Sequence, residues 1–454
     1  MSYLSPICSL FALALFLGAP LSLSAEEELY VELSSQIALL PTYVSPIEMG
    51  SSEFPKNYWD SLVRVLAFDL ANNGMMQLRE APIKGVDSSY ESAVSFDVLR
   101  GEHLAYLIRL RAVGSELQLK LISVDTEEAR VIDQLFMSGT LSQDRRKVHR
   151  LADTIASVLF GVPGVASQRI LFCVKKKGAK AGSWVSEVCE ADYDGHNARV
   201  LTHDQSLAMH PQYIPLAGGP PTSFLYVSHK IGQPKMFRAR LAGGMPKRVS
   251  PIRGNQLTPC LSRDGGQLAF TCDVSGTTDL FCARFHADEG AIGKARQIFA
   301  AKGAAEASPA FSPDGKKIAF VSDKDGSAKI YLMDVPEGGE MPAPRLITKR
   351  FRENSAPAWS PDGKKIAYSA RTTGLRQIWI YEVETGKELE ITHGDFSAEN
   401  PAWAPNSVHL LFNAENKAGT ELYLINIYQK LPVKVTSGEG EKRFPSWEPW
   451  VNAP

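Results

Sequence analysis

A repeated segment occupies most of the chain after residue 200. The segments Ser308–Phe320 and Ala356–Tyr368 are nearly identical, and each contains the run Ser-Pro-Asp-Gly-Lys-Lys. Weaker copies flank them, and each copy is anchored by a proline. These prolines are spaced 44 to 50 residues apart, at Pro211, Pro259, Pro309, Pro357, Pro401 and Pro445. A period of this length is typical of propeller blades, so it constrains the fold more than any other feature of the sequence.

Each copy of the repeat predicts a β-hairpin followed by two further strands. Ser-Pro-Asp-Gly favours a tight turn, with proline at its second position and glycine in a left-handed conformation. A second turn such as Ser322–Gly326 and a third strand such as Lys329–Asp334 follow, and a fourth strand ends most units. We expect Asp264, Asp314 and Asp362 to form turns and to carry no catalytic or metal-binding role.

The fourth strands give an independent count of the blades. A similar strand end recurs six times, at Leu201, Val249, Ile298, Ile347, Ile391 and Val435. The first block, 169–202, has only three strand patterns, and the last has only the proline-led one, Phe444–Trp447. A C-terminal strand that joins the first blade would close the ring and leave no exposed sheet edge. The sequence therefore predicts an all-β six-bladed propeller over 169–454, closed by the C-terminal strand.

Residues 25–160 lack the repeat and mix helical with strand periodicity, which predicts a separate α/β N-terminal domain. We expect a buried strand over 36–41, a helix over 58–73, strands over 105–113, 116–124 and 131–137, and a helix over 145–160 capped by Asp144. Gly161–Gly164 then opens a linker over 161–168.

Residues 1–24 are typical of a secretory signal peptide. Residues 7–17 are apolar, and Ser22–Ala25 offers the small residues that a signal peptidase needs. The apolar run is shorter than the roughly 20 residues that cross a bilayer. The first basic residue is Lys56, which departs from the usual charged n-region and leaves an uncleaved anchor as the alternative.

Charge and composition indicate an ordinary folded protein whose partners are recognised locally. Lys and Arg number 49 against 50 Asp and Glu, so no global field attracts nucleic acid or an anionic membrane. The basic run Lys175–Lys177 falls in an expected hairpin loop, where it is either solvated or in contact with a partner. The five cysteines beyond Cys8 are either buried thiols or include a cross-strand pair such as Cys173 with Cys189.

The sequence predicts neither an enzyme nor a cofactor. No Gly-x-Ser-x-Gly nucleophile elbow occurs, and no Gly-Lys is followed by Ser or Thr as a phosphate-binding loop requires. The 9 histidines lack metal-ligand spacing. Asp192 and Asp194, which precede Gly195, are interpreted as part of a turn.

Beyond the common repeat, several segments resemble the TolB family, the periplasmic propeller component of the Tol-Pal envelope system. They are Ala-Asp-Tyr-Asp-Gly-His-Asn at 191–197, Leu-Phe-Gly-Val-Pro-Gly at 159–164, Phe-Pro-Ser-Trp-Glu-Pro-Trp at 444–450 and the helix end at 68–74. The resemblance covers essentially the whole mature chain. The uncharged n-region, the irregular unit at 203–225 and the extra cysteines depart from it.

The resemblance implies a periplasmic monomer that binds two proteins and reaches the membrane only through them. One is the peptidoglycan-associated lipoprotein Pal, held by one propeller face, and the other is the inner-membrane protein TolA, reached by the mature N-terminus. The implied role is in outer-membrane integrity and constriction during cell division. No nucleic acid is expected as a partner.

The loops that lead from a fourth strand into the next proline-led strand all emerge on one propeller face, where they line a common mouth. The residues predicted to bind Pal there are Asn255, Gln256, Thr258, Glu306, Ser308, Glu353, Asn354, Ser355, Glu399, Asn400, Lys442 and Arg443. A strand-like segment is predicted to bind TolA by β-augmentation; it comprises Glu26, Glu27, Glu28, Leu29, Tyr30, Val31, Glu32 and Leu33. The alternative is a propeller that binds a small glycan or peptide in the same mouth.

Overall fold

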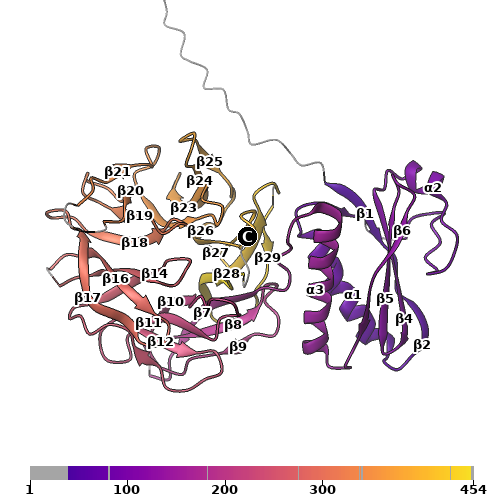
Figure 1. Ribbon diagram of the computed structural model, residues 1–454, viewed down its shortest axis with the longest axis horizontal. Helices are drawn as coiled ribbons and strands as arrows, with labels where there is room; N and C mark the ends of the chain where they lie inside the picture. Colours follow the sequence, from indigo (N-terminus) through magenta and orange to yellow (C-terminus); the bar gives the residue numbers. More distant parts are fainter. Residues whose placement is uncertain are drawn as a thin grey trace, which may run out of the picture.

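The chain forms a small α/β domain and a six-bladed β-propeller that lie side by side (Figure 1). The structure is a computed structural model that describes residues 39–450, apart from 80, 81, 181, 275, 337, 339, 340 and 430. The predicted signal peptide at 1–24 and the predicted TolA-binding segment at 26–33 lie outside the described residues. Among the described residues, no helix is long and apolar enough to cross a membrane.

The N-terminal domain is a mixed sheet with two long helices packed on the face toward the propeller (Figure 1). The sheet has the order β3-β1-β4-β5-β6, and β2 pairs with β4. Its elements are β1 (Leu40–Val44), β2 (Glu48–Ser52), α1 (Lys56–Ala71), β3 (Met76–Leu78), α2 (Phe96–Gly101), β4 (Tyr106–Gly114), β5 (Glu116–Ser123), β6 (Ala129–Phe136) and α3 (Leu141–Phe160).

Helix α3 begins earlier than the sequence indicated. Thr140 is its N-cap, and Asp144 lies in the first turn instead of capping the helix. The Asp144 carboxylate accepts hydrogen bonds from the Ser138 backbone N–H at 2.9 Å and from the Tyr58 hydroxyl at 2.6 Å. Asp144 therefore ties α3 to α1, and the helix gains a turn. The first described strand, β1, covers Leu40–Val44, and the strand predicted at 36–41 begins outside the described residues.

Six four-stranded antiparallel sheets form the propeller, and the prediction of six blades closed by the C-terminal strand is confirmed. In chain order, the inner strands of the second to sixth blades are β10 (Ala208–Tyr213), β14 (Gln256–Leu261), β18 (Glu306–Phe311), β22 (Asn354–Trp359) and β26 (Ser397–Trp403). The closing blade has the order β30-β7-β8-β9, with β30 (Glu441–Trp447), β7 (Arg169–Lys177), β8 (Trp184–Asp192) and β9 (Arg199–Val200). In this blade the last described strand pairs with the first strand of the propeller.

The remaining strands complete each blade outward from the channel. They are β11 (Ser223–Ser228), β12 (Lys235–Arg240), β13 (Lys247–Arg248), β15 (Gln267–Cys272), β16 (Asp279–His286), β17 (Gly290–Phe299), β19 (Lys317–Ser322), β20 (Lys329–Asp334), β21 (Arg345–Leu346), β23 (Lys365–Arg371), β24 (Arg376–Glu382), β25 (Glu388–Glu390), β27 (His409–Asn416), β28 (Gly419–Asn426) and β29 (Val433–Lys434).

A β-bulge interrupts every inner strand at the residue before its anchoring proline. In β18, for example, Ser308 has a φ of 48°, and the register with β19 shifts between Ala307 and Ala310. Proline has no N–H to donate to the neighbouring strand. The bulge interrupts the pairing at this point, so no carbonyl of the neighbouring strand is left opposite the proline without a donor. The residues with this positive φ are His210, Thr258, Ser308, Ala356, Asn400 and Phe444. The repeat therefore encodes a ring of six bulges around the channel.

The Ser-Pro-Asp-Gly segments form the predicted turns. Gly315 has a φ of 69°, and its N–H donates to the Ser312 carbonyl at 2.8 Å. The Asp314 carboxylate accepts from the Lys316 backbone N–H at 3.1 Å, so this aspartate holds its own turn. The turns formed around Asp264 and Asp362 repeat these backbone contacts.

All five cysteines of the described part are free thiols. Cys173 is directly opposite Val188 in the β7–β8 ladder, so the neighbouring residue Cys189 points to the other face of the sheet. The two thiols belong to different apolar clusters. The register therefore excludes a disulfide between Cys173 and Cys189. Burial raises the pKa of both thiols.

Candidate binding face and domain interface

The predicted mouth lies on the propeller face opposite the N-terminal domain. In the closing blade, β30 starts at Glu441 opposite Lys175 and ends at Trp447 opposite Ile170. The Trp447 end contacts the N-terminal domain, because Ile170 and Trp447 share one apolar cluster with the buried faces of α1 and α3. The loops that precede the inner strands therefore stand at the far end.

Four of the predicted mouth residues are buried inside the chain. Gln256, Glu306, Asn354 and Lys442 occupy the same position near the start of four inner strands, and each is at most 4% exposed. Gln256 donates through Nε2 to the Ile252 carbonyl at 2.8 Å, and Asn354 donates through Nδ2 to the Phe351 carbonyl at 3.0 Å. These side chains fix the loops of the mouth from within, which leaves them little surface for a partner.

Glu306 is the unusual member of this set, because it brings a carboxyl group where two other blades have an amide. Its Oε1 accepts a hydrogen bond from the Ser322 hydroxyl at 3.1 Å, while its Oε2 is buried with no hydrogen-bond partner among the described residues. Burial raises the pKa of Glu306 from 4.5 to about 7. The mouth therefore holds one carboxyl group that titrates near neutral pH.

The other predicted mouth residues are partly exposed, and the structure separates them into two groups. Thr258, Ser308 and Asn400 occupy bulge positions in the channel wall. The others stand at or near the rim: Asn255, Glu353, Ser355, Glu399 and Arg443. Asn255 is held by Asp273, whose Oδ2 accepts from its Nδ2 at 2.7 Å.

The rim residues are linked by a chain of ion pairs across three neighbouring blades. Arg376 lies 3.2 Å from Glu353 and 3.1 Å from Glu399. Arg443 continues the chain, 3.8 Å from Glu399 and 3.0 Å from Glu441. All five side chains keep part of their surface exposed, so a partner would meet an alternating pattern of charge. The sequence identified Glu353, Glu399 and Arg443 but missed Arg376, which projects from a third-position strand and follows no repeat motif.

A channel of about 640 Å³ runs along the inner strands. Its wall contains the six anchoring prolines and several aromatic residues, among them Trp359, Trp403, Phe444 and Trp450. The His210 ring packs 4.2 Å from the Phe444 ring, and burial lowers the pKa of His210 to about 4. The channel is therefore largely apolar and carries a neutral histidine at neutral pH.

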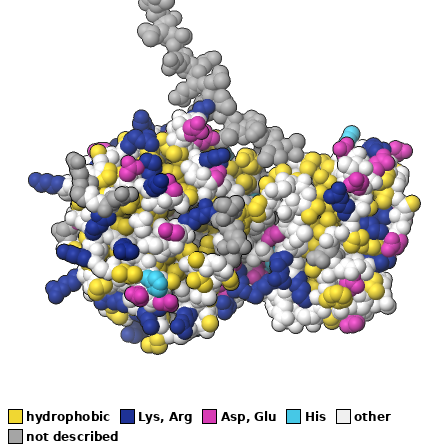
Figure 2. All heavy atoms as spheres, viewed as in Figure 1, with side chains coloured by type: hydrophobic (Ala, Val, Ile, Leu, Met, Phe, Trp, Pro, Cys, Tyr) yellow, Lys and Arg dark blue, Asp and Glu magenta, His cyan; other side chains and the backbone are white. Residues whose placement is uncertain are grey.

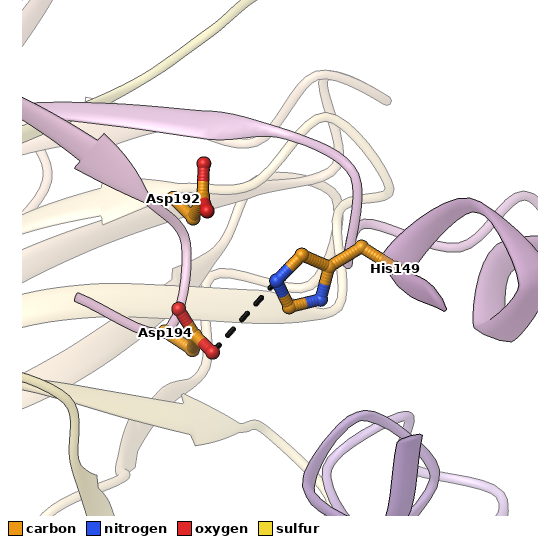
Figure 3. Close-up of side chains that lie close together, drawn as sticks. All are labelled: His149, Asp192 and Asp194. Atoms are coloured by element: carbon orange, nitrogen blue, oxygen red, sulfur yellow. Dashed lines mark ion pairs between the residues drawn. The ribbon is translucent and has the colours of Figure 1, made fainter. Parts of the chain in front are cut away.

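On the opposite face, a buried cluster of charged groups joins the two domains (Figure 3). Nδ1 of His149 on α3 lies 2.8 Å from Asp69 on α1, and its Nε2 faces Asp194 of the propeller at 3.8 Å. The Tyr193 hydroxyl donates to Asp69 at 2.8 Å, and Arg145 forms an ion pair with Asp194. Residues from α1, α3 and the end of β8 thus converge on one buried site.

Burial and mutual contact shift the protonation of this cluster. The pKa of Asp69 is raised from 3.8 to about 6, because burial outweighs the stabilising contact with His149. The pKa of His149 is also raised, since the carboxylates of Asp69 and Asp194 outweigh the opposing effect of burial. The pair therefore holds a proton to a higher pH than an exposed carboxyl group would.

The cluster contains three potential metal ligands, His149, Asp192 and Asp194, within 4.8 Å of one another. Arginines already neutralise its carboxylates, however: Arg145 pairs with Asp194, and Nε of Arg146 lies 3.5 Å from Asp192. A dication would have to displace or repel both guanidinium groups. The arrangement is that of a domain junction and not of a metal centre.

The turn that carries Asp194 is held by a close backbone approach between the closing blade and the sixth blade. A Cβ on Gly195, whose φ is 82°, would lie 1.8 Å from the Val435 carbonyl oxygen. The linker is also fastened, because Asp153 of α3 accepts from the backbone N–H groups of Ala166 and Ser167 at 2.8 and 2.9 Å. The turn predicted at Asp192–Gly195 exists, but it also forms part of the junction, which no motif of the sequence indicated. The available signal was the spacing of Arg145 and His149 on the buried face of a helix.

These features define a class of protein, a two-domain β-propeller with one face fixed to a second domain and the other carrying a charged mouth. Comparison with known proteins narrows the class. A family model described as the TolB beta propeller domain matches residues 157–451. The TolB homolog of Protochlamydia amoebophila is 42% identical over 361 residues, which cover 77% of this chain and 76% of that protein. The TolB homolog of Chlamydia caviae is 34% identical over 327 residues, covering 72% of this chain and 71% of that protein.

The fold is shared with a solved structure as well. The crystal structure of TolB from Acinetobacter baumannii superposes with a TM-score of 0.73 at 20% identity, covering 91% of this chain and 97% of that one. This chain belongs to the TolB family.

Proposed function

We propose that this chain is the periplasmic, non-catalytic component of a Tol-Pal system and that its propeller mouth binds a Pal-like lipoprotein. Membership of the TolB family supports this role, and the half-exposed ion pairs around Arg376 and Arg443 carry the assignment of the face. A partner that matches their alternating charges gains specificity and a faster encounter. The system would maintain outer-membrane integrity and support constriction during cell division.

The test of the mouth uses residues that are accessible and spares the buried ones. We expect replacement of Asn255, Asn400 and Arg443 together by alanine to weaken binding of a purified Pal-like domain at least tenfold in calorimetry. Lys316→Ala, on the opposite face, is the control and should leave the affinity unchanged. Unchanged affinity in the triple variant would remove the mouth from the proposal.

We further propose that the segment Glu26–Leu33 binds TolA as an added β-strand. Its support is the alternation of Leu29, Val31 and Leu33, which would give such a strand one apolar side. A chain that lacks 26–33 should lose TolA in a pull-down while it retains the Pal-like domain. If TolA still binds, this segment is not its site.

A second candidate function is the binding of a small glycan or peptide in the channel. The aromatic wall formed by Trp359, Trp403, Phe444 and Trp450 favours it, because such rings stack on sugars and proline-rich peptides. Titration with soluble muropeptides should then quench tryptophan fluorescence, and Trp403→Leu should abolish the signal. If the propeller binds only a protein partner at its mouth, muropeptides should not quench the tryptophan fluorescence.

A further inference from the structure

The β7–β8 hairpin of the closing blade extends beyond the corresponding hairpins of other blades. Both strands have 9 residues, against 8 each for β27 and β28 of the sixth blade and 6 each for β11 and β12. Every residue of the two strands is paired, from Arg169 with Asp192 to Lys177 with Trp184. The extension therefore continues a regular ladder, and we call its outer part, residues 175–186, the lysine hairpin.

The lysine hairpin stands on the mouth face. Its first residue, Lys175, pairs with Glu441 at the start of β30, and the Lys175 Nζ lies 3.5 Å from the Glu441 carboxylate. Glu441 in turn pairs with Arg443, so the hairpin adjoins the chain of ion pairs at the rim. A partner seated on the mouth would lie beside it.

The lysine hairpin carries uncompensated positive charge and an exposed aromatic ring. Lys176, Lys177 and Lys180 are exposed, and none has an acidic partner within ion-pair distance among the described residues. No acidic residue occurs between 175 and 186. Trp184 is 44% exposed, and the Lys175 Nζ lies 4.6 Å from the centre of its ring. Because these neighbouring lysines repel one another and have no acidic partner, binding of an anionic partner would be favourable.

We propose that the lysine hairpin is a second docking element, which binds an acidic surface of the protein that occupies the mouth, with Trp184 making the apolar contact. The proposal rests on the proposed function and adds the chemistry of the partner. Lys176, Lys177 and Lys180 supply long-range attraction, and the paired strands hold them without a loss of backbone freedom on binding.

The rest of the mouth face argues for a protein surface and against an anionic membrane. Asp325 is 54% exposed and Glu415 55% exposed, and both stand at the mouth ends of their blades. Each is paired with a cation, Lys324 or Arg443, so a flat anionic bilayer that met the lysine hairpin would find no further net positive charge at these blade ends. Figure 2 likewise shows Lys and Arg interspersed with Asp and Glu on the propeller surface in view. A protein with one local acidic patch avoids this conflict.

The test reverses the charge of the lysine hairpin in the full-length mature chain. Lys176→Glu, Lys177→Glu and Lys180→Glu are combined, and binding of a purified Pal-like domain is measured by calorimetry at 50 and 300 mM salt. The matched control combines Lys294→Glu, Lys316→Glu and Lys364→Glu, which changes the net charge equally at exposed lysines away from the mouth. We expect at least a tenfold loss at 50 mM salt for the hairpin variant, a smaller loss at 300 mM, and less than a twofold change for the control.

Trp184 supplies a second measurement that does not depend on the Pal-like domain. A glutamate-rich peptide should alter the fluorescence of the native chain, and this change should disappear in Trp184→Phe and in the hairpin variant. Vesicles with an anionic lipid serve as the competing probe. A Trp184 signal with vesicles and none with the acidic peptide would overturn the proposal in favour of a membrane contact.

The outcomes separate this proposal from the function on which it rests. If the mouth variant loses the Pal-like domain while the lysine hairpin variant binds normally, the hairpin proposal is wrong and the function stands. If the native chain does not bind the Pal-like domain, the function fails, and the peptide titration still decides whether the hairpin takes an acidic partner. Equal losses in the hairpin variant and the control would also refute a localised site.

Discussion

The two faces of the propeller hold their ion pairs in opposite surroundings. At the domain junction, Arg145 and Asp194 keep only 10% and 4% of their side chains exposed. At the mouth, Arg443 is 23% exposed and its partner Glu415 is 55% exposed. A buried pair that loses one member leaves a stranded charge, whereas an exposed pair exchanges its partner for water. The junction is therefore built for fixed geometry, and the mouth for exchange with a partner.

Gly195→Val should have the largest effect, because the added side chain would force apart the closing blade and the sixth blade at the turn that carries Asp194. The added side chain would collide with the Val435 carbonyl, and the positive φ of 82° would be strained. We expect a loss of about 4 kcal/mol or more in the free energy of unfolding. Chemical denaturation checks this, with Gly101→Ala as control since no neighbour lies within 4 Å of its Cβ. A fully stable Gly195→Val would show that the two blades can move apart at this turn.

Arg145→Ala should cost about 3 kcal/mol, because it strands Asp194 in the interface. Arg130→Ala is the control, since Arg130 and its partner Glu128 are 63% and 56% exposed. The control should change stability by less than about 1 kcal/mol. Similar losses in the two variants would contradict the contrast between buried and exposed pairs.

Asp69→Asn should change the pH dependence of stability. The folded pKa of Asp69 is about 6, above its usual 3.8, so the folded chain binds more protons than the unfolded chain between these values. The raised pKa of His149 acts in the same direction, and stability falls as pH rises. From pH 5 to 7.5 the native chain should lose about 1–2 kcal/mol relative to Asp69→Asn. Stability is measured by thermal unfolding at each pH. If the stabilities of the two proteins change equally with pH across this range, Asp69 and His149 do not share a proton.

Glu306→Gln probes a buried group on the mouth side. Because the folded pKa is about 7 against 4.5, ionisation destabilises the folded chain as pH rises through this range. Relative to pH 5, the variant should gain about 2 kcal/mol of stability over the native chain at pH 8. The amide is the group already present in the equivalent residues Gln256 and Asn354. Equal stabilisation at both pH values would point to packing and not to charge.

Arg443→Ala should have the smallest effect on stability, below about 1 kcal/mol, because its ion pairs are exposed. Its effect on binding of the Pal-like domain should be much larger than its effect on unfolding. Denaturation and calorimetry on the same preparation compare the two. A loss of stability as large as that of Arg145→Ala would show that the rim is a structural element.

The propeller could be predicted from the sequence because the residues that form each blade act locally and recur in every repeat. Each Ser-Pro-Asp-Gly turn and each anchoring proline acts within its own blade, so Gly315 and Asp314 behave as predicted. The start of α3 was placed too late because Asp144 looks like a cap, while a distant hydrogen bond from Tyr58 holds it within the helix. The mouth residues were predicted in loops, but Gln256 and Asn354 are the first residues of β14 and β22, and their burial depends on contacts with Ile252 and Phe351 in the preceding loops.

The sequence by itself determined the repeat, the number of blades, the closure by the C-terminal strand and the likeness to one family. These depend on periodicity and turn chemistry, which operate over a few residues. Only the tertiary structure decided that Asp69, His149 and Asp194 meet in a buried junction, that Arg376 joins Glu353 to Glu399, and that the lysine hairpin stands beside the mouth. Such contacts join residues tens to hundreds of positions apart, and their geometry is set by how blades and domains pack together.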